Sequence, residues 1–311
     1  MQIGFNLPIS GPGCSPESVT RIAQQGEALG YDYLTLTDHI VLPNLRVPGY
    51  PYSESGEFFG EGPERRYEQL TAAAYAAAKT TRIKLVLAVM VVPHTPTVLA
   101  AKMLSTIDVL SGGCLVVGIG AGWLEAEFDA IVGPAFAARG RMTDEYLSAF
   151  RNLWTQKTPR FNGDWIEFDG VLFEPKPAQK PHPPIWVGGE SGPSLRRAAR
   201  FGDPWYPIGS NNKHPLDTLP RYRAGIDRSR QLVAEAASRR ASPRPIASSD
   251  TEKLCPPSPP TASGGYFRAA RATSSPICRR RATSVSLRST SISSEPIQTT
   301  RSPKCAGFGS T

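Results

Sequence analysis

The sequence has no long apolar run, few cysteines and, toward its C-terminal end, few aromatic or acidic residues. The longest strongly apolar run, residues 85–92, is far below the ~20 residues that a membrane-spanning helix needs. The first eight residues lack the basic segment that opens a signal peptide and have the pattern of a strand. We therefore expect no membrane partner and a cytoplasmic location.

The five cysteines form no CxxC or other metal-type spacing. Cys14 and Cys114 lie in the first part of the chain, and the other three follow residue 250. This sparse and unpatterned set fits a reduced intracellular protein, and we expect no metal site.

Residues 238–311 differ in composition from the rest of the chain. They contain 12 of the 35 basic residues, but only 3 of the 27 acidic and 3 of the 27 aromatic residues. Such a segment cannot bury enough apolar surface to offset a backbone entropy cost of roughly 1–2 kcal/mol per residue. The composition predicts a nearly neutral body, residues 1–237, and a basic, disordered tail, residues 238–311.

Within the body, short β-rich runs alternate with helical stretches, as is typical of a parallel α/β fold. Strands are expected at 3–7, 33–37, 84–92, 115–119, 184–187 and 205–208; helices at 17–29, 67–79, 96–110, 142–154 and 193–201; and a hairpin around 161–173. The loop 42–62 is too long for a simple connector and predicts a lid. Eight strand–helix units would close a (β/α)₈ barrel of the TIM type. We expect an incomplete barrel with six strands, and a doubly wound sheet is the alternative.

The pair Asp38-His39 directly follows the second expected strand, at the end where barrels and open α/β sheets both carry their chemistry. The ordinary pKa of histidine, about 6.5, suits a general base at neutral pH. His39 is therefore the candidate catalytic residue. The alternative is that it only caps or packs the loop.

Two glycine-rich segments follow later strands. Residues 118–123 read Gly-Ile-Gly-Ala-Gly-Trp, and alternate glycines allow a flat ligand to approach the backbone. The tryptophan at 123 does not fit a dinucleotide fingerprint. Residues 188–191, Gly-Gly-Glu-Ser, precede a helix and form a candidate phosphate site at its N-terminus. A plain structural turn is the alternative for both segments.

Other polar residues near element boundaries predict structure rather than chemistry. Four charged residues have the pattern of ion pairs that hold loops: Glu127, Arg139, Arg141 and Glu145. Three histidines are expected in loops and not as ligands: His94, His182 and His214.

Nine short segments occur in a recognisable order. They are IGFNLP (3–8), EALGYD (27–32), TDH (37–39), YPY (50–52), PHTP (93–96), LSGG (110–113), GIGAGW (118–123), RGR (139–141) and PIWVGG (184–189). This order resembles the luciferase-like monooxygenase superfamily, most closely its deazaflavin-dependent oxidoreductases. Each segment alone is weak evidence for the family, but nine segments in the family's order over residues 1–210 are specific evidence.

The resemblance implies a barrel that holds coenzyme F420, or FMN as the alternative, and that transfers a hydride between this cofactor and a small organic substrate. It implies that Asp38 and His39 border the ring, with His39 as acid or base. Ala88 and Val89 correspond to a strand bulge that often contains a non-prolyl cis peptide bond behind the ring. Six further residues would contact the cofactor: Gly118, Gly120, Gly122, Gly188, Gly189 and Ser191.

The chain also departs from the family pattern. Cys114 stands where an arginine is usual, and Pro204 where a glycine is usual. After about residue 237 the tail replaces the last two strand–helix units, and we interpret it as sequence read outside the family's frame. This interpretation predicts an open barrel with weak or absent activity.

A second hypothesis is a protein without catalysis, either an inactive barrel fragment or a body whose basic tail binds nucleic acid nonspecifically. The expected partner under the first hypothesis is a small-molecule substrate, with no specific nucleic acid. A homodimer is one option for its assembly.

Overall fold

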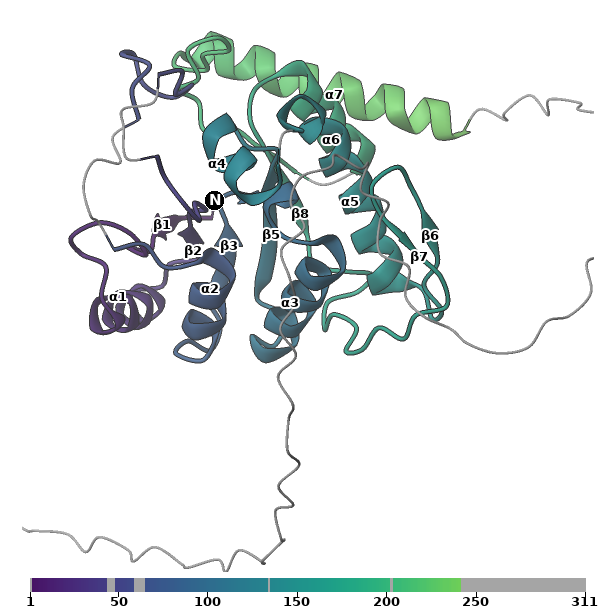
Figure 1. The fold of residues 1–311 in the computed structure, drawn as a ribbon. Coiled ribbons are helices and arrows are strands. Elements are labelled where there is room, and N and C mark those ends of the chain that lie inside the picture. Colours follow the sequence, from purple (N-terminus) through teal and green to yellow (C-terminus); the bar gives the residue numbers. More distant parts are fainter. Residues whose placement is uncertain (1, 44–47, 59–64, 134, 202–203, 242–311) are drawn as a thin grey trace, which may run out of the picture. The chain divides into compact units, whose positions relative to one another are not determined.

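One parallel sheet forms the centre of the structure, and its strands follow one another in chain order. The computed structural model describes residues 2–43, 48–58, 65–133, 135–201 and 204–241 (Figure 1). Neighbouring strands along the order β1-β2-β3-β5-β8-β9 are all parallel. The strands are β1 (Gly4–Asn6), β2 (Tyr33–Leu36), β3 (Lys84–Leu87), β4 (Met90–Val91), β5 (Leu115–Gly120), β8 (Ile185–Gly188) and β9 (Trp205–Tyr206). A doubly wound sheet reverses its order at a switch point, so this uninterrupted order is that of a barrel.

Helices connect these strands. They are α1 (Pro16–Ala28), α2 (Gln69–Ala77), α3 (Thr97–Leu110), α4 (Glu125–Ile131), α5 (Arg139–Thr155), α6 (Gly192–Phe201) and α7 (Leu219–Ala241), with the 3-10 turns η1 (Val92–His94) and η2 (Phe136–Ala138). The expected hairpin is β6 (Phe161–Asn162) and β7 (Glu167–Phe168). The α/β prediction is confirmed, and α4 and α7 are helices that the sequence analysis did not assign.

The sheet is curled into a half barrel. Tyr33 lies on β2 and Trp186 on β8, three positions along the sheet, which is roughly 14 Å in a flat sheet. Their ring centroids are nevertheless 6.1 Å apart, and the ring of Trp186 is 5.4 Å from that of Tyr206 on β9. These rings therefore lie together on the concave side of the sheet.

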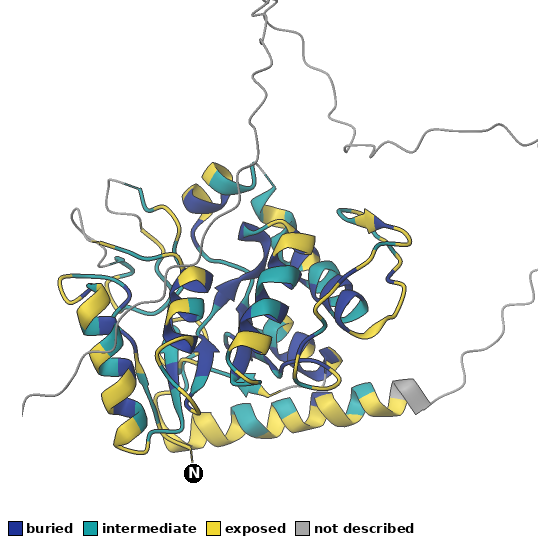
Figure 2. Cartoon of the chain, turned by 90° about the horizontal axis from the view of Figure 1, so that it is seen from below, coloured by how far each residue is buried: buried dark blue, intermediate teal, exposed yellow. Residues whose placement is uncertain are grey.

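The opposite side of the sheet carries the main core. Along β2, Leu34 and Leu36 are fully buried while Tyr33 and Thr35 between them are only partly buried. This alternation gives one face to the helices and the other to the concave side. Figure 2 shows the strands as the most buried part of the fold and α7 as largely exposed.

The helix α7 packs on α6 through a small cluster, with Leu232 and Ala236 against Leu195 and Ala199. It continues to Ala241, a few residues past the expected end of the body. The rest of the expected tail, with its predicted disorder and altered reading frame, lies outside the described residues. No helix in the described part of the chain has the length and apolar character that a membrane crossing requires.

A bulge separates β3 from β4, which pairs with the distal part of β5. The peptide bond Ala88–Val89 at this bulge is cis, as the resemblance implied. A Cβ at Gly120 or at Gly188 would stand 2.7 Å from a methyl group of Val89. A Cβ at Gly118 would clash with the carbonyl oxygen of Leu87. These glycines therefore make room for the bulge.

The close contact between Gly118 and the Leu87 carbonyl oxygen predicts that Gly118→Ala destabilises the protein. The added methyl group meets backbone that cannot rotate away, so overpacking should cost about 1–3 kcal/mol or more. We expect the melting temperature, followed by circular dichroism, to fall by roughly 5 °C or more. Gly13→Ala is the matched control, because its nearest atom, Cβ of Pro8, is 3.9 Å away. Equal melting of both variants would contradict this account.

Candidate active site

The carboxyl ends of the strands bring together residues that are far apart in the sequence. Asp38 and His39 follow β2, Val91 ends β4 and Trp123 follows β5. The ring of His39 is 6.3 Å from that of Trp123, and the carboxylate of Asp38 accepts a hydrogen bond from the Val91 N–H. These residues therefore share one edge of the half barrel.

His39 is held by a buried carboxylate. Its Nδ1 lies 2.7 Å from Oε2 of Glu127, whose side chain is 1% exposed. The other oxygen, Oε1, accepts hydrogen bonds from the N–H groups of Ile40 and Val41, at 2.7 and 3.2 Å. One carboxylate on α4 thus fixes both the ring of His39 and the backbone that follows it.

The protonation of this pair follows from its surroundings. Burial by itself raises the pKa of Glu127, but the hydrogen bond and charge of His39 and the N–H of Ile40 outweigh burial and lower this pKa. An ionised carboxylate only accepts hydrogen bonds, so Nδ1 of His39 carries a proton. In the neutral ring, Nε2 is then the proton acceptor.

The pKa of Asp38 is shifted in the opposite direction from that of Glu127. Burial and the negative charge of Glu127 raise its pKa from the usual 3.8 to about 7, against the opposing effects of the Val91 N–H and His39. The carboxyl group is therefore partly protonated at neutral pH, and its protonated form can donate a hydrogen bond.

The glycines that end β5 and β8 lie against the bulge and do not border open space. On the side where a Cβ would stand, Gly120 and Gly188 meet Val89. Gly122 has a φ of +85° and its carbonyl oxygen accepts a hydrogen bond from Nε of Arg139 at 3.0 Å. Arg139 thus holds this loop through a backbone carbonyl oxygen, whereas an ion pair was expected from the sequence.

The segment after β8 is the candidate phosphate site. Gly189 has a φ of +95°, and Oγ of Ser191 lies 3.0 Å from Oγ of Ser194 in the first turn of α6. Arg197 on the same helix is not available to an anion there. It is 6% exposed, and its Nε donates to Asp144 at 2.6 Å.

Aromatic rings cover the His39 side of the site. Tyr50 and Phe58, from the long loop after β2, pack on each other and on Trp123 with centroid distances of 5.1 to 5.3 Å. The ring of Phe58 is also 5.1 Å from that of His39. Residues 48–58 of the predicted lid therefore lie over the His39 side of the site.

Two residues of this site, Glu127 and Glu190, were not predicted as site residues, and the buried His94 was expected only in a loop. Glu127 was assigned to structure alone, although an acidic residue beside the strand ends was a usable signal. Glu190 was placed in the candidate phosphate segment 188–191 without a role for its side chain, which is only 6% exposed. His94 is buried under α4, against Phe128, and both of its ring nitrogens lack a partner. Burial lowers the pKa of His94, which keeps the ring neutral.

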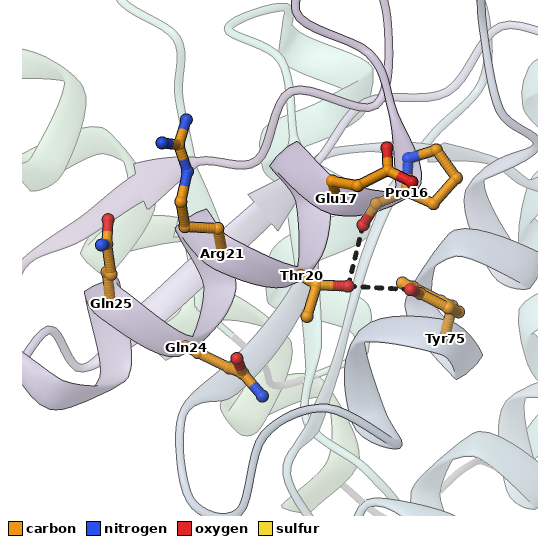
Figure 3. A pocket seen from close by; sticks show the side chains of 7 residues that line it. All are labelled: Pro16, Glu17, Thr20, Arg21, Gln24, Gln25 and Tyr75. Carbon is orange, nitrogen blue, oxygen red and sulfur yellow. Dashed lines mark hydrogen bonds between the residues drawn. The ribbon is translucent and has the colours of Figure 1, made fainter.

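A groove of about 450 Å³ lies elsewhere, on the outer surface of α1 and α2 (Figure 3). There, Oγ1 of Thr20 and the hydroxyl of Tyr75 are 2.7 Å apart. It contains none of the predicted site residues. The described ranges also hold no group of three His, Cys, Asp or Glu side chains that could bind a metal ion.

Comparison with known proteins agrees with this geometry. The family model described as luciferase-like monooxygenase matches residues 1–254, which extends past the point where the motifs ended. The FMNH₂-dependent dimethylsulfone monooxygenase of Pseudomonas putida is 36% identical over 168 residues, covering 53% of this chain and 46% of that protein. The chain thus spans about half the length of this curated relative.

Solved structures give the same fold. Monooxygenase RslO1 from Streptomyces bottropensis has a TM-score of 0.58 at 25% identity, over 76% of this chain and 67% of that one. The coenzyme F420 dependent tetrahydromethanopterin reductase from Methanopyrus kandleri also reaches 0.58, at 17% identity, over 76% of this chain and 62% of that one.

The raised pKa of Asp38 predicts a pH-dependent effect of Asp38→Asn. The folded protein keeps a proton that the unfolded chain releases, so the stability contributed by protonated Asp38 is complete below pH ~4 and lost as pH rises through about 7. The asparagine does not titrate, and its oxygen can still accept from Val91. We expect the variant to melt above the parent at pH 8.5, by a smaller margin at pH 5.

The exposed residue Asp129 on α4 provides the control, since Asp129→Asn should melt with the parent at both pH values. If the difference in melting temperature between Asp38→Asn and the parent did not change with pH, the pKa of Asp38 would not be raised, and the prediction would be wrong.

Proposed function

Since the chain belongs to the luciferase-like monooxygenase family, we propose that it is an oxidoreductase that binds a flavin-type cofactor at the carboxyl edge of the half barrel. In this proposal His39 moves a proton of a small organic substrate. The observation that carries the proposal is the 2.7 Å contact between Nδ1 of His39 and the buried carboxylate of Glu127.

This contact suits His39 to proton transfer. Glu127 fixes the ring in one orientation and leaves Nε2 as the acceptor, and its negative charge favours the imidazolium that forms when Nε2 takes a proton. Glu127 is thus a positioning residue for His39. A flavin-type cofactor supplies the two-electron chemistry when it is bound.

Other residues of the site fit such a cofactor. The protonated form of Asp38 can donate a hydrogen bond to a carbonyl of the ring. Ser191, Ser194 and the backbone at the start of α6 offer hydrogen-bond donors to a phosphate. The bulge at Ala88 and Val89 would support the ring from behind. The aromatic cover from residues 48–58 would exclude water from the reacting atoms.

Two cofactors are candidates. The Pseudomonas relative at 36% identity is FMNH₂-dependent, whereas the F420-dependent reductase resembles this chain at 17% identity, which supports the fold alone. We therefore rank reduced FMN ahead of F420, the reverse of the order that the sequence motifs favoured. The cytoplasmic location and the homodimer remain predictions.

The cofactor assignment predicts selective binding. We expect FMN to bind with micromolar or better affinity in a fluorescence titration, and F420 to bind more weakly. Tighter binding of F420 would move the chain to the deazaflavin-dependent enzymes. Binding of neither cofactor would contradict the proposal and favour the inactive fragment.

The proton role predicts the effect of His39→Ala. General acid–base catalysis typically contributes 10²–10⁴-fold, so turnover should fall by roughly 10²-fold or more while FMN binding stays unchanged. Glu127→Gln should lower turnover less, since it leaves the ring in place without the charge. Dimethyl sulfone, with reduced FMN and oxygen, is the first substrate to test, because the Pseudomonas relative is named for it.

His214, an exposed histidine, provides the control for this series. His214→Ala should retain parental turnover. If His39→Ala remained within about threefold of the parent, the proton would have to be transferred by another group.

A further inference from the structure

The covering loop, residues 48–58, is folded by contacts of its own. The N–H groups of Gly49 and Tyr50 both donate to the carbonyl oxygen of Gly56, at 2.9 Å each. An antiparallel bridge also joins the two arms of the loop near its ends. Because the arms are bonded to each other, the loop can move as one unit.

The segment that follows β9 is a second loop with internal contacts. The N–H of Leu216 donates to the carbonyl oxygen of Gly209 at 2.8 Å and closes the segment. Within it, Oδ1 of Asn211 accepts hydrogen bonds from the N–H groups of Lys213 and His214, at 3.0 Å each. The shape of this segment is therefore set by bonds within the segment.

Asn212 joins these two loops. Its N–H donates to the carbonyl oxygen of Pro51 at 2.8 Å, and its side-chain amide donates to the carbonyl oxygen of Ser53. The covering loop leaves β2, whereas Asn212 follows β9, four positions away in the order of the strands. Figure 1 shows the two loops side by side at the top of the view. The covering loop therefore bridges the two sides of the half barrel at its carboxyl edge.

This contact can open at small cost. Asn212 is exposed, and a hydrogen bond at the surface competes with water, so that it changes an equilibrium by only roughly 2–10-fold. The same loop carries Tyr50 and Phe58, whose rings pack on each other, and Phe58 covers the ring of His39 at 5.1 Å. Because the loop is one unit, the contact with Asn212 also sets where these rings lie.

We propose that Asn212 positions the aromatic cover over His39 and that its release from Pro51 and Ser53 admits and frees the ligand of the site. The inference rests on the proposed binding of a flavin-type cofactor. Asn212 contacts the backbone of the covering loop, not reacting atoms, so it is a positioning residue. In this proposal the same bonds close the loop over the empty and the occupied site. Weakening them therefore accelerates entry and release together and leaves the affinity almost unchanged.

Stopped-flow fluorescence with FMN tests this inference. Asn212→Ala removes the side-chain donor, and in Asn212→Asp the ionised carboxylate cannot donate to Ser53. We expect each variant to raise the association and dissociation rate constants by the same factor, roughly 2–10-fold, with Kd within about twofold of the parent. Lys213→Ala is the matched control, because Lys213 is exposed and bonds to Asn211 through its backbone N–H, which the variant keeps. It should leave both rate constants unchanged.

Hydrogen exchange, followed by NMR, measures the same contact without any ligand. The amide of residue 212 bonds to Pro51, whereas the amides of Gly49 and Tyr50 bond within the covering loop. In Asn212→Ala we expect the protection factor of the residue 212 amide to fall by roughly 2–10-fold, while those of Gly49 and Tyr50 stay the same.

Unchanged rate constants in both Asn212 variants would overturn the inference. A rise in the dissociation rate constant alone would also overturn it, because Asn212 would then stabilise the bound ligand and not control its passage. If the parent protein bound no FMN, the proposed function itself would fail, and the protection factors alone would decide whether Asn212 holds the covering loop.

Discussion

The carboxylate of Glu127 is the contact on which the arrangement of the site depends. It is buried and remains ionised, and it accepts hydrogen bonds from Nδ1 of His39 and from the N–H groups of Ile40 and Val41. Three donors offset the cost of burying its charge. The same contacts tie α4 to the chain that leaves β2, and so set where the covering loop begins. Orientation of the histidine and the course of the loop are therefore two results of one interaction.

The bulge between β3 and β4 provides the second constraint. Val89 fills the space left by Gly120 and Gly188, and the strand then rejoins the sheet so that Val91 can donate to Asp38. The residue that packs against the sheet, Val89, is thus only two positions from Val91, which holds Asp38 in the site. One bulge therefore both packs the sheet and positions a residue of the site, so few further side chains are needed to fix the site.

Much of the fold could be predicted because strand and helix patterns are local. The alternation of β-rich runs with helical stretches and the order of the motifs predicted the barrel and placed Asp38 and His39 directly after the second strand. The sequence showed which acidic residues lie near the strand ends, but it did not show which distant residue each of them contacts. Glu127 reaches His39 across 88 positions of sequence. The alternate glycines suggested room for a flat ligand, whereas Val89 lies against Gly120 and Gly188.

The central claim is that Glu127 fixes His39 with the proton on Nδ1 and the acceptor on Nε2. Nitrogen-15 NMR of the histidine side chains, near neutral pH, measures this tautomer directly. The account predicts that the neutral ring of His39 is the Nδ1–H tautomer in the parent protein and that this preference weakens in Glu127→Gln. An Nε2–H tautomer, or a tautomer that Glu127→Gln leaves unchanged, would contradict it.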